Sequence, residues 1–361
     1  MTDAMWGISL LWALVFIYAL GGSVDFGAGF WAMVFYRQKD ARAATIANRY
    51  LSPLWEVTNV FLVLFAVALV GLFPGAALAY GSVLLVPGNL ILILLTIRTV
   101  FMVYAHSVER YQGLLRVISG ITGLLIPALL VTVFALAQGG IVTKNSLGFQ
   151  VSMPVLFQNQ GVYSYIVLAL LSELFISSMV LADYARVAED DSAFLVYRRL
   201  ALWFGPLAML SAFLVVWTIS TTASWFRTAL TGQWTWFLAS FVCFLAAMVL
   251  AVVSHTHHHK RFRLAVVLMA AQYLLAMIGY GRAHLPYLMY PYLTVQNSFT
   301  TLAMFRTLLI VLIVGIAVLF PGFIWFWRLF LENKAYVGKH EVEAESAPIP
   351  SRLRERGKGR I

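Results

Sequence analysis

Long apolar runs recur along this 361-residue chain, and they limit its fold more than any other feature. Each run has about 20 residues, which is enough for a helix to cross the roughly 30 Å hydrocarbon core of a bilayer. Hydrophobic residues make up 61% of the chain and charged residues 11%, against about 25% charged in an average soluble domain. The alternation that the strands of a membrane barrel need is absent from the runs. The sequence therefore predicts an all-α, polytopic membrane protein.

We expect nine membrane spans. Their approximate ranges are 6–35, 53–73, 77–104, 114–137, 161–183, 198–220, 234–254, 262–281 and 299–328. Lys and Arg gather after the first, third, fifth and seventh spans and in the C-terminal tail, whereas the other loops hold one basic residue or none. Because basic loops stay in the cytoplasm, we expect the N-terminus outside and the C-terminus in the cytoplasm. The same distribution explains the net charge of +10 without a nucleic-acid partner.

Local signals refine these boundaries. Segment 36–50 is basic and Ala-rich, and we expect a short amphipathic helix at the cytoplasmic surface. The second span would then begin at Pro53, a favourable first residue of a helix. Pro87 and Gly88 predict a kink inside the third span. Residues 333–361 are charged and punctuated by Pro and Gly, which predicts a disordered tail.

Three charged residues lie inside the apolar runs, where each costs roughly 2.5–3.5 kcal/mol on insertion scales. They are Asp25, Glu56 and Arg98, in the first three spans, and the expected topology places all three in the cytoplasmic half of the membrane. Consecutive spans are often neighbours, so we expect these side chains to meet. Two acids beside one base can exchange a proton with the cytoplasm. A compensated ion pair that holds three helices in register is the structural alternative.

Other residues accompany this cluster. The glycines around Asp25 should let a neighbouring helix approach closely; they are Gly21, Gly22, Gly27 and Gly29. Asn59 is expected to orient water or a side chain, and Trp55 adjoins Glu56. Glu173, near the middle of the fifth span, is expected to be isolated from the cluster, either as a secondary proton site or hydrogen-bonded to a neighbouring helix.

The histidines argue against a haem held by this chain. Haem within a bilayer normally needs an axial histidine, and none of the seven histidines lies in the middle of a span. The cluster His255 and His257–His259 lies beside Lys260 without a nearby carboxylate or thiol, which favours a basic loop over a metal site. Cys243 is alone in an apolar run and is expected to be a packing residue. No phosphate-binding loop or nucleophile elbow is present.

Three stretches resemble subunit II of cytochrome bd-type quinol oxidases. They are Gly22–Trp31, Pro53–Glu56 and Ile97–Phe101. Chain length, span number, orientation and the basic tail also agree with that family. The resemblance implies two four-helix bundles plus one peripheral helix. It divides the chain into 1–137 (first bundle, with the charged cluster), 138–281 (second bundle), 282–332 (outer loop and ninth helix) and 333–361 (cytoplasmic tail).

The resemblance also implies a reaction. Asp25, Glu56 and Arg98 fall on family positions that contribute to a cytoplasmic proton path, in an electrogenic, non-pumping reduction of oxygen to water. The partner, subunit I, would carry haem b, with or without haem d, and the quinol site. This chain would hold no cofactor itself, beyond a structural quinone or lipid, and a small accessory subunit could join the pair. The expected location is a bacterial cytoplasmic membrane.

One departure from the family pattern is visible after Glu56. Val57-Thr58-Asn59 stands where the family usually has Gly-Asn-Gln or similar. This suggests a divergent branch, similar to the cyanide-insensitive or haem-d-lacking relatives. Two other functions stay open on the sequence. One is an ion-coupled secondary transporter that uses Asp25, Glu56 and Glu173, and the other is a structural subunit without chemistry of its own.

Overall fold

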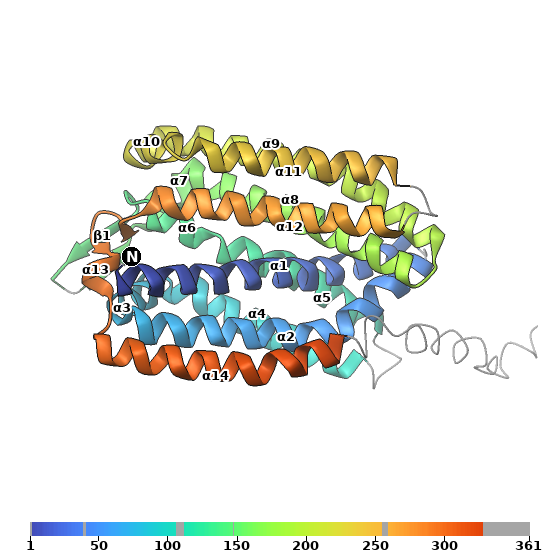
Figure 1. The fold of residues 1–361 in the computed structure, drawn as a ribbon, viewed down its shortest axis with the longest axis horizontal. Helices are drawn as coiled ribbons and strands as arrows, with labels where there is room; N and C mark the ends of the chain where they lie inside the picture. Colours follow the sequence, from blue (N-terminus) through green and yellow to red (C-terminus); the bar gives the residue numbers. More distant parts are fainter. Residues whose placement is uncertain (1, 39–40, 106–111, 147, 255–258, 328–361) are drawn as a thin grey trace, which may run out of the picture.

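The structure is a computed structural model that describes residues 2–38, 41–105, 112–146, 148–254 and 259–327. These residues form fourteen helices and four short strands (Figure 1). The helices are α1 Asp3–Gln38, α2 Ala41–Leu72, α3 Pro74–Val83, α4 Leu85–Ala105, α5 Gln112–Leu130, α6 Thr132–Ala137, α7 Met153–Gln158, α8 Gln160–Val187, α9 Asp191–Thr222, α10 Ser224–Thr231, α11 Trp234–Val253, α12 His259–His284, α13 Val295–Ser298 and α14 Leu302–Trp327. The strands are β1 Val142–Asn145, β2 Gly148–Val151, β3 Tyr287–Met289 and β4 Leu293–Thr294, paired as two antiparallel hairpins.

The long helices confirm an all-α membrane protein. Within the described residues, six helical segments are long and apolar enough to span a membrane, formed by α1, α5 with α6, α8, α9, α11 and α12. The bent pair α2 and α3 makes a seventh if it is counted as one span. Two further apolar segments, Leu85–Phe101 of α4 and Leu302–Val318 of α14, lie where the third and ninth spans are expected. The number nine itself stays a prediction.

Pro53 does not begin a helix, so the expectation of a helix start there is wrong. Across residues 41–72, α2 is one continuous helix, so Pro53 lies inside it and no separate surface helix precedes it. The first turns of α2 bury small apolar side chains in the core: Ala43, Ala44, Ile46 and Ala47. The Tyr197 hydroxyl of α9 also donates a hydrogen bond to the Ala43 carbonyl at 2.7 Å. Packing against the rest of the protein therefore stabilises this part of the helix.

The predicted third span is two helices. Phe73 is non-helical (φ −133°, ψ 63°), α3 starts at Pro74, and the axes of α2 and α3 differ by 119°. Proline suits this place because the first residue of a helix needs no N–H donor. α4 begins only at Leu85, so Pro87 and Gly88 lie in its first turn and produce no kink in mid-helix.

The predicted tail 333–361 and the residues 255–258 lie outside the described residues.

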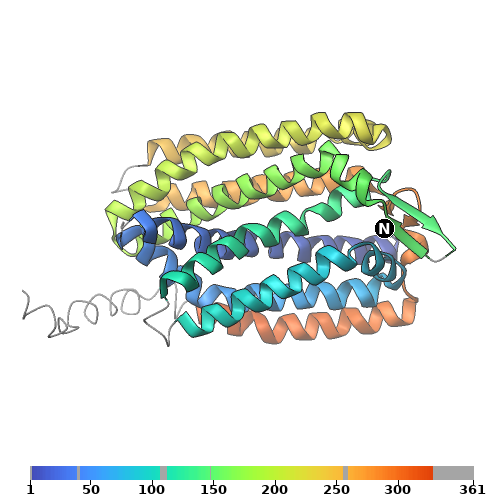
Figure 2. The ribbon, with the colours of Figure 1, turned by 180° about the vertical axis from the view of Figure 1, so that it is seen from behind.

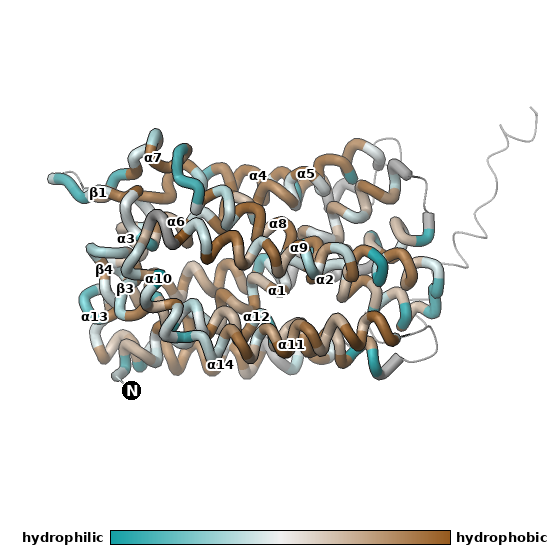
Figure 3. The backbone as a smooth tube through the Cα atoms, turned by 90° about the horizontal axis from the view of Figure 1, so that it is seen from above, coloured by the Kyte–Doolittle hydropathy of each residue, from teal (hydrophilic) through white to brown (hydrophobic). Residues whose placement is uncertain are grey.

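Helix α1 lies at the centre of the assembly, packed against α2, α5 and α8 (Figures 1 and 2). The other close pairs are α8 with α9, α11 with α12, and α4 with α5. The largest core combines Trp31 of α1 with Phe175 of α8, Phe194 of α9 and Phe262 of α12. Figure 3 shows the hydrophobic residues along the long helices and the hydrophilic ones mainly at their ends and in the hairpins. The two halves of the chain therefore share one interior.

Gly27 marks a very close approach of α1 to α8. A Cβ atom at Gly27 would lie 2.3 Å from the Ser177 hydroxyl oxygen and 3.2 Å from the Glu173 backbone oxygen. One turn further on, the Trp31 indole donates a hydrogen bond to the same Ser177 hydroxyl at 3.0 Å. The expectation of close helix contact is thus confirmed at Gly27. A Cβ atom at Gly21 or Gly22 would lie 3.8 Å from the Thr58 side chain, which is an ordinary van der Waals distance.

We expect Gly27→Ala to destabilise the protein by about 1–3 kcal/mol, because adding a methyl group to a packed site forces neighbours to move. Gly81→Ala in α3 is the matched control, since a Cβ there would meet nothing within 4 Å. Thermal unfolding of the purified, detergent-solubilised protein measures both variants. Equal melting temperatures would contradict the tight α1–α8 contact.

Candidate functional site

Asp25 and Arg98 form an ion pair in the interior of the helix assembly. The Arg98 Nη2 atom lies 3.1 Å from Oδ1 of Asp25, and it also donates to the Asp25 backbone carbonyl at 2.9 Å. The two side chains are 4% and 3% exposed, respectively. The expectation that the charges of the first and third spans meet is therefore confirmed, whereas their role stays a prediction.

Helix α5 supplies the other partner of Arg98. The Nη1 atom donates to the Ser119 backbone carbonyl at 2.7 Å and to the Ser119 hydroxyl at 3.2 Å. One guanidinium thus joins α1, α4 and α5. Ser119 was not expected at this site, and the only signal for it in the sequence is a stretch rich in small residues, Ser-Gly-Ile-Thr-Gly, that ends at Gly123.

Glycines make room for this guanidinium. A Cβ atom at Gly29 of α1 would lie 3.0 Å from the Arg98 Nη1 atom, and one at Gly123 of α5 would lie 3.2 Å from it. The Phe26 ring closes another side, with its centroid 5.1 Å from the Arg98 Cζ atom. A buried guanidinium is tolerated when its donors meet acceptors and its charge has a counter-ion. The spacing of small residues on α1 and α5 lets both terminal nitrogens of Arg98 meet acceptors, whereas its buried Nε atom has no hydrogen-bond partner among the described residues.

Glu173 is part of the same cluster, so the expectation that it is isolated is wrong. Glu173 is fully buried, and its backbone oxygen lies 3.2 Å from where a Cβ atom at Gly27 would be, two residues from Asp25. The charges of Arg98 and Asp25 act on its carboxyl, although it forms no ion pair with Arg98 among the described residues. Its position follows from the α1–α8 contact at Gly27, which joins the first span to the fifth. In the described part of the chain neither carboxyl oxygen has a hydrogen-bond partner, so the alternative of a hydrogen bond to a neighbouring helix is not observed there.

The expected residues of α2 are only partly described. The side chains of Glu56 and Trp55 lie outside the described ones, although both positions belong to α2. Thr58 is buried and faces α1, with its Cγ2 atom 3.8 Å from where a Cβ at Gly22 would be. Asn59 is half-buried and is not among the described hydrogen-bond partners of Asp25 or Arg98. That Glu56 and Asn59 belong to the charged cluster therefore stays a prediction.

Aromatic rings enclose the one histidine side chain that the structure describes. His284 is the one histidine whose side chain is described, and its Nδ1 atom lies 2.8 Å from the Tyr287 carbonyl oxygen. Three aromatic rings pack around the imidazole, those of Trp225, Phe226 and Tyr280, with centroids 5.2–6.2 Å away. A macrocycle would have to displace them. No group of three potential metal ligands occurs in the described part of the chain.

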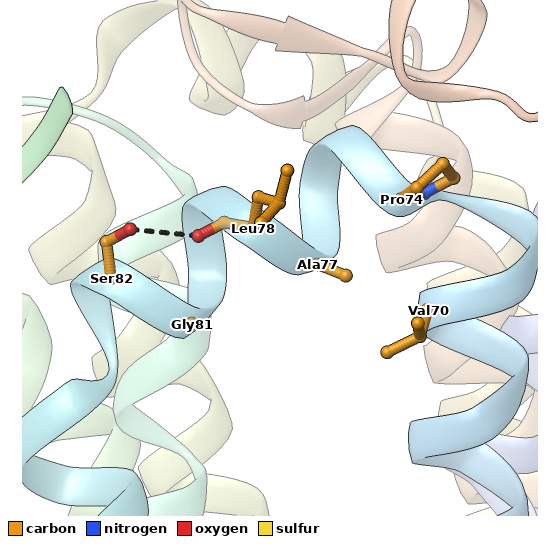
Figure 4. A pocket seen from close by; sticks show the side chains of 6 residues that line it. All are labelled: Val70, Pro74, Ala77, Leu78, Gly81 and Ser82. Carbon is orange, nitrogen blue, oxygen red and sulfur yellow. Dashed lines mark hydrogen bonds between the residues drawn. The ribbon is translucent and has the colours of Figure 1, made fainter.

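An open apolar groove of about 620 Å³ lies beside the bend between α2 and α3 (Figure 4). It is lined by Val70, Pro74, Ala77, Leu78, Gly81 and Ser82. The Ser82 hydroxyl donates a hydrogen bond to the Leu78 carbonyl at 2.9 Å within α3. The groove therefore offers a surface for apolar chains, and its lining lacks the charges that acid–base chemistry needs.

Comparison with known proteins identifies the family. The family model described as cytochrome bd terminal oxidase subunit II matches residues 3–330. A Bacillus subtilis (strain 168) protein, provisionally named cytochrome bd menaquinol oxidase subunit II, is 43% identical over 343 residues, which are 94% of this chain and 99% of that protein. A chain in the structure of bd oxidase from Geobacillus thermodenitrificans is 35% identical, with a TM-score of 0.80 over 92% of this chain and 100% of that chain. The chain thus belongs to the cytochrome bd terminal oxidase subunit II family, and it is a membrane-integral subunit of an oxidoreductase complex.

Proposed function

We propose that this chain supports a haem-bearing subunit I in a quinol:oxygen oxidoreductase and contributes to proton uptake from the cytoplasm. Family membership supports the oxidase role. The name of the Bacillus subtilis relative supports menaquinol as the electron donor. The observation that carries the proton role is the buried Asp25–Arg98 pair with Glu173 in electrostatic reach.

The number of charges favours proton handling over a purely structural pair. A closed ion pair needs one acid and one base, and it can often be replaced by apolar residues without loss of stability. Here a second buried acid, Glu173, shares the surroundings of the single cation. With both acids ionised the cluster would carry a net negative charge in an apolar interior, which is costly. One proton distributed over the two carboxyls removes that charge.

The proposed arrangement in the membrane follows the sequence. It has nine spans in two four-helix bundles and a peripheral ninth helix, with the N-terminus outside. Protons taken from the cytoplasmic side would cross part of the membrane field, where each charge is worth about 2.3 kcal/mol per 100 mV. Uptake from one side makes the reaction electrogenic without pumping.

The first test is purification of the tagged chain after gentle solubilisation. We expect a second polytopic subunit to co-purify and a reduced-minus-oxidised absorption spectrum to show haem bands. The band positions would separate a partner with haem b alone from one with haem b and haem d. A colourless protein without a partner would contradict the oxidase role and favour an ion-coupled transporter.

The second test separates a proton group from a structural ion pair. Asp25→Asn breaks the buried ion pair and leaves Arg98 with only the more weakly placed Glu173 as a counter-charge, and we expect a loss of up to about 3–5 kcal/mol of stability. The double variant Asp25→Asn/Arg98→Gln removes both charges and should recover much of that loss. If Asp25 transfers protons, oxygen consumption should stay about tenfold or more below wild type in both variants. Recovery of activity together with stability in the double variant would show a structural pair.

Glu56 gives a third prediction. We expect Glu56→Ala to lower oxygen consumption by the purified complex while haem content is unchanged, because the variant removes a carboxyl from the proposed proton path. Val60→Ala, one turn along α2 and half-exposed, is the matched control and should retain wild-type turnover. Oxygen electrode traces measure both, and equal rates would remove Glu56 from the path.

A further inference from the structure

The two halves of the chain repeat one order of helices. In the first half α1 is followed by α2 with the short α3, then α4 and α5; in the second, α8 is followed by α9 with the short α10, then α11 and α12. Both α2 and α9 have 32 residues. Each ends at one non-helical residue, Phe73 (φ −133°, ψ 63°) and Ala223 (φ −141°, ψ 77°), before the short helix begins. The pairs α1–α2 and α4–α5 correspond to α8–α9 and α11–α12.

This repeat places Glu173 at the position of Asp25. The two breaks, Phe73 and Ala223, are 150 residues apart in the sequence, and Asp25 and Glu173 are 148 apart. Each acid lies in the first helix of its half, in α1 and α8. Because these two helices meet at Gly27, the repeat brings its two acids to neighbouring places in the interior.

The second half lacks the cation of the first. Helix α4 carries Arg98, whereas its counterpart α11 has no charged residue between Trp234 and Val253. Glu173 therefore has no arginine from α11, and Arg98 is the cation whose field reaches it. Both Glu173 oxygens lack a hydrogen-bond partner among the described residues. The neutral acid, which carries an O–H group that it can donate, is therefore the main form of Glu173, and the charge of Arg98 makes the ionised form accessible as a minor one.

We infer that Glu173 is a second proton-binding acid of this cluster, and that it exchanges one proton with Asp25 beside a shared Arg98. In one state Glu173 holds the proton on a carboxyl oxygen and Asp25 is ionised. In the other the O–H bond at Glu173 is broken, the proton is bound to Asp25, and Glu173 is ionised. The cluster of two carboxyls and one guanidinium is neutral in both states, so the transfer moves no net charge into the apolar interior.

One further buried polar group lies near the two acids. The Tyr18 hydroxyl of α1 lies within electrostatic reach of Asp25 and Arg98, and it too is buried without a hydrogen-bond partner in the described part of the chain. Buried polar groups in native proteins are normally satisfied, by ordered water where the protein offers no partner. The role of this exchange in oxygen reduction rests on the proposed function. The inference that Glu173 binds a proton does not rest on it.

The test is infrared spectroscopy of the intact complex, wild type and Glu173→Gln, with turnover and haem content measured on the same preparations. We expect wild type to show the carbonyl band of a protonated carboxyl, shifted in D₂O, and the variant to lose it. Turnover should fall about tenfold or more in the variant, with haem content unchanged. Glu189→Gln, just beyond the C-terminal end of α8, is the matched control and should keep both band and turnover.

Two results would overturn the inference. A carboxyl band that persists in Glu173→Gln would show that the proton is not on Glu173. A lost band with wild-type turnover would show a protonated acid that transfers nothing. Failure of the oxidase proposal is distinguishable, because it would appear as a wild-type preparation without a haem-bearing partner, in which the band of Glu173 could still be measured.

Discussion

The guanidinium of Arg98 is the interaction on which the first half of the fold depends. It comes from α4, which packs along α5 and contacts α3, and it binds the main chains of both α1 and α5. Such a group is stable inside a membrane protein only where acceptors surround it, because an unpaired buried charge costs several kcal/mol. The small residues of α1 and α5 let those acceptors come within hydrogen-bond distance. The hydrogen bonds of one side chain thus hold α1, α4 and α5 together.

The sequence predicted what hydropathy and charge determine locally. Apolar length indicated the spans, and the rarity of charges inside them indicated that Asp25, Glu56 and Arg98 would meet, of which Asp25 and Arg98 are seen to do so. The path of the chain between spans was predicted less well. Hydropathy does not distinguish burial against lipid from burial against protein, so the core packing of Ala43 and Ile46 could not be foreseen. Hydropathy also does not show where the chain changes direction, so the bend at Phe73 was not predicted.

Glu173 shows a second limit of the sequence. Its separation from the charged spans, with α8 following a long outer loop, favoured an isolated acid. Neighbour rules for consecutive helices cannot show that α1 packs directly on α8. The contact depends on Gly27 and Ser177, two small residues 150 positions apart. The internal repeat, which relates Glu173 to Asp25, is visible in the order of the helices and in the breaks at Phe73 and Ala223.

The partners of Arg98 also bear on whether this cluster could exchange protons without rearranging helices. Of its four described hydrogen bonds, only the one to Oδ1 of Asp25 depends on the charge of that carboxyl. The other three go to the Asp25 carbonyl, the Ser119 carbonyl and the Ser119 hydroxyl. A proton bound to Asp25 would leave those three in place. Arg98 would then act as a fixed cation, held mainly by main-chain carbonyls, and a proton could move between two carboxyls beside it while every helix keeps its position.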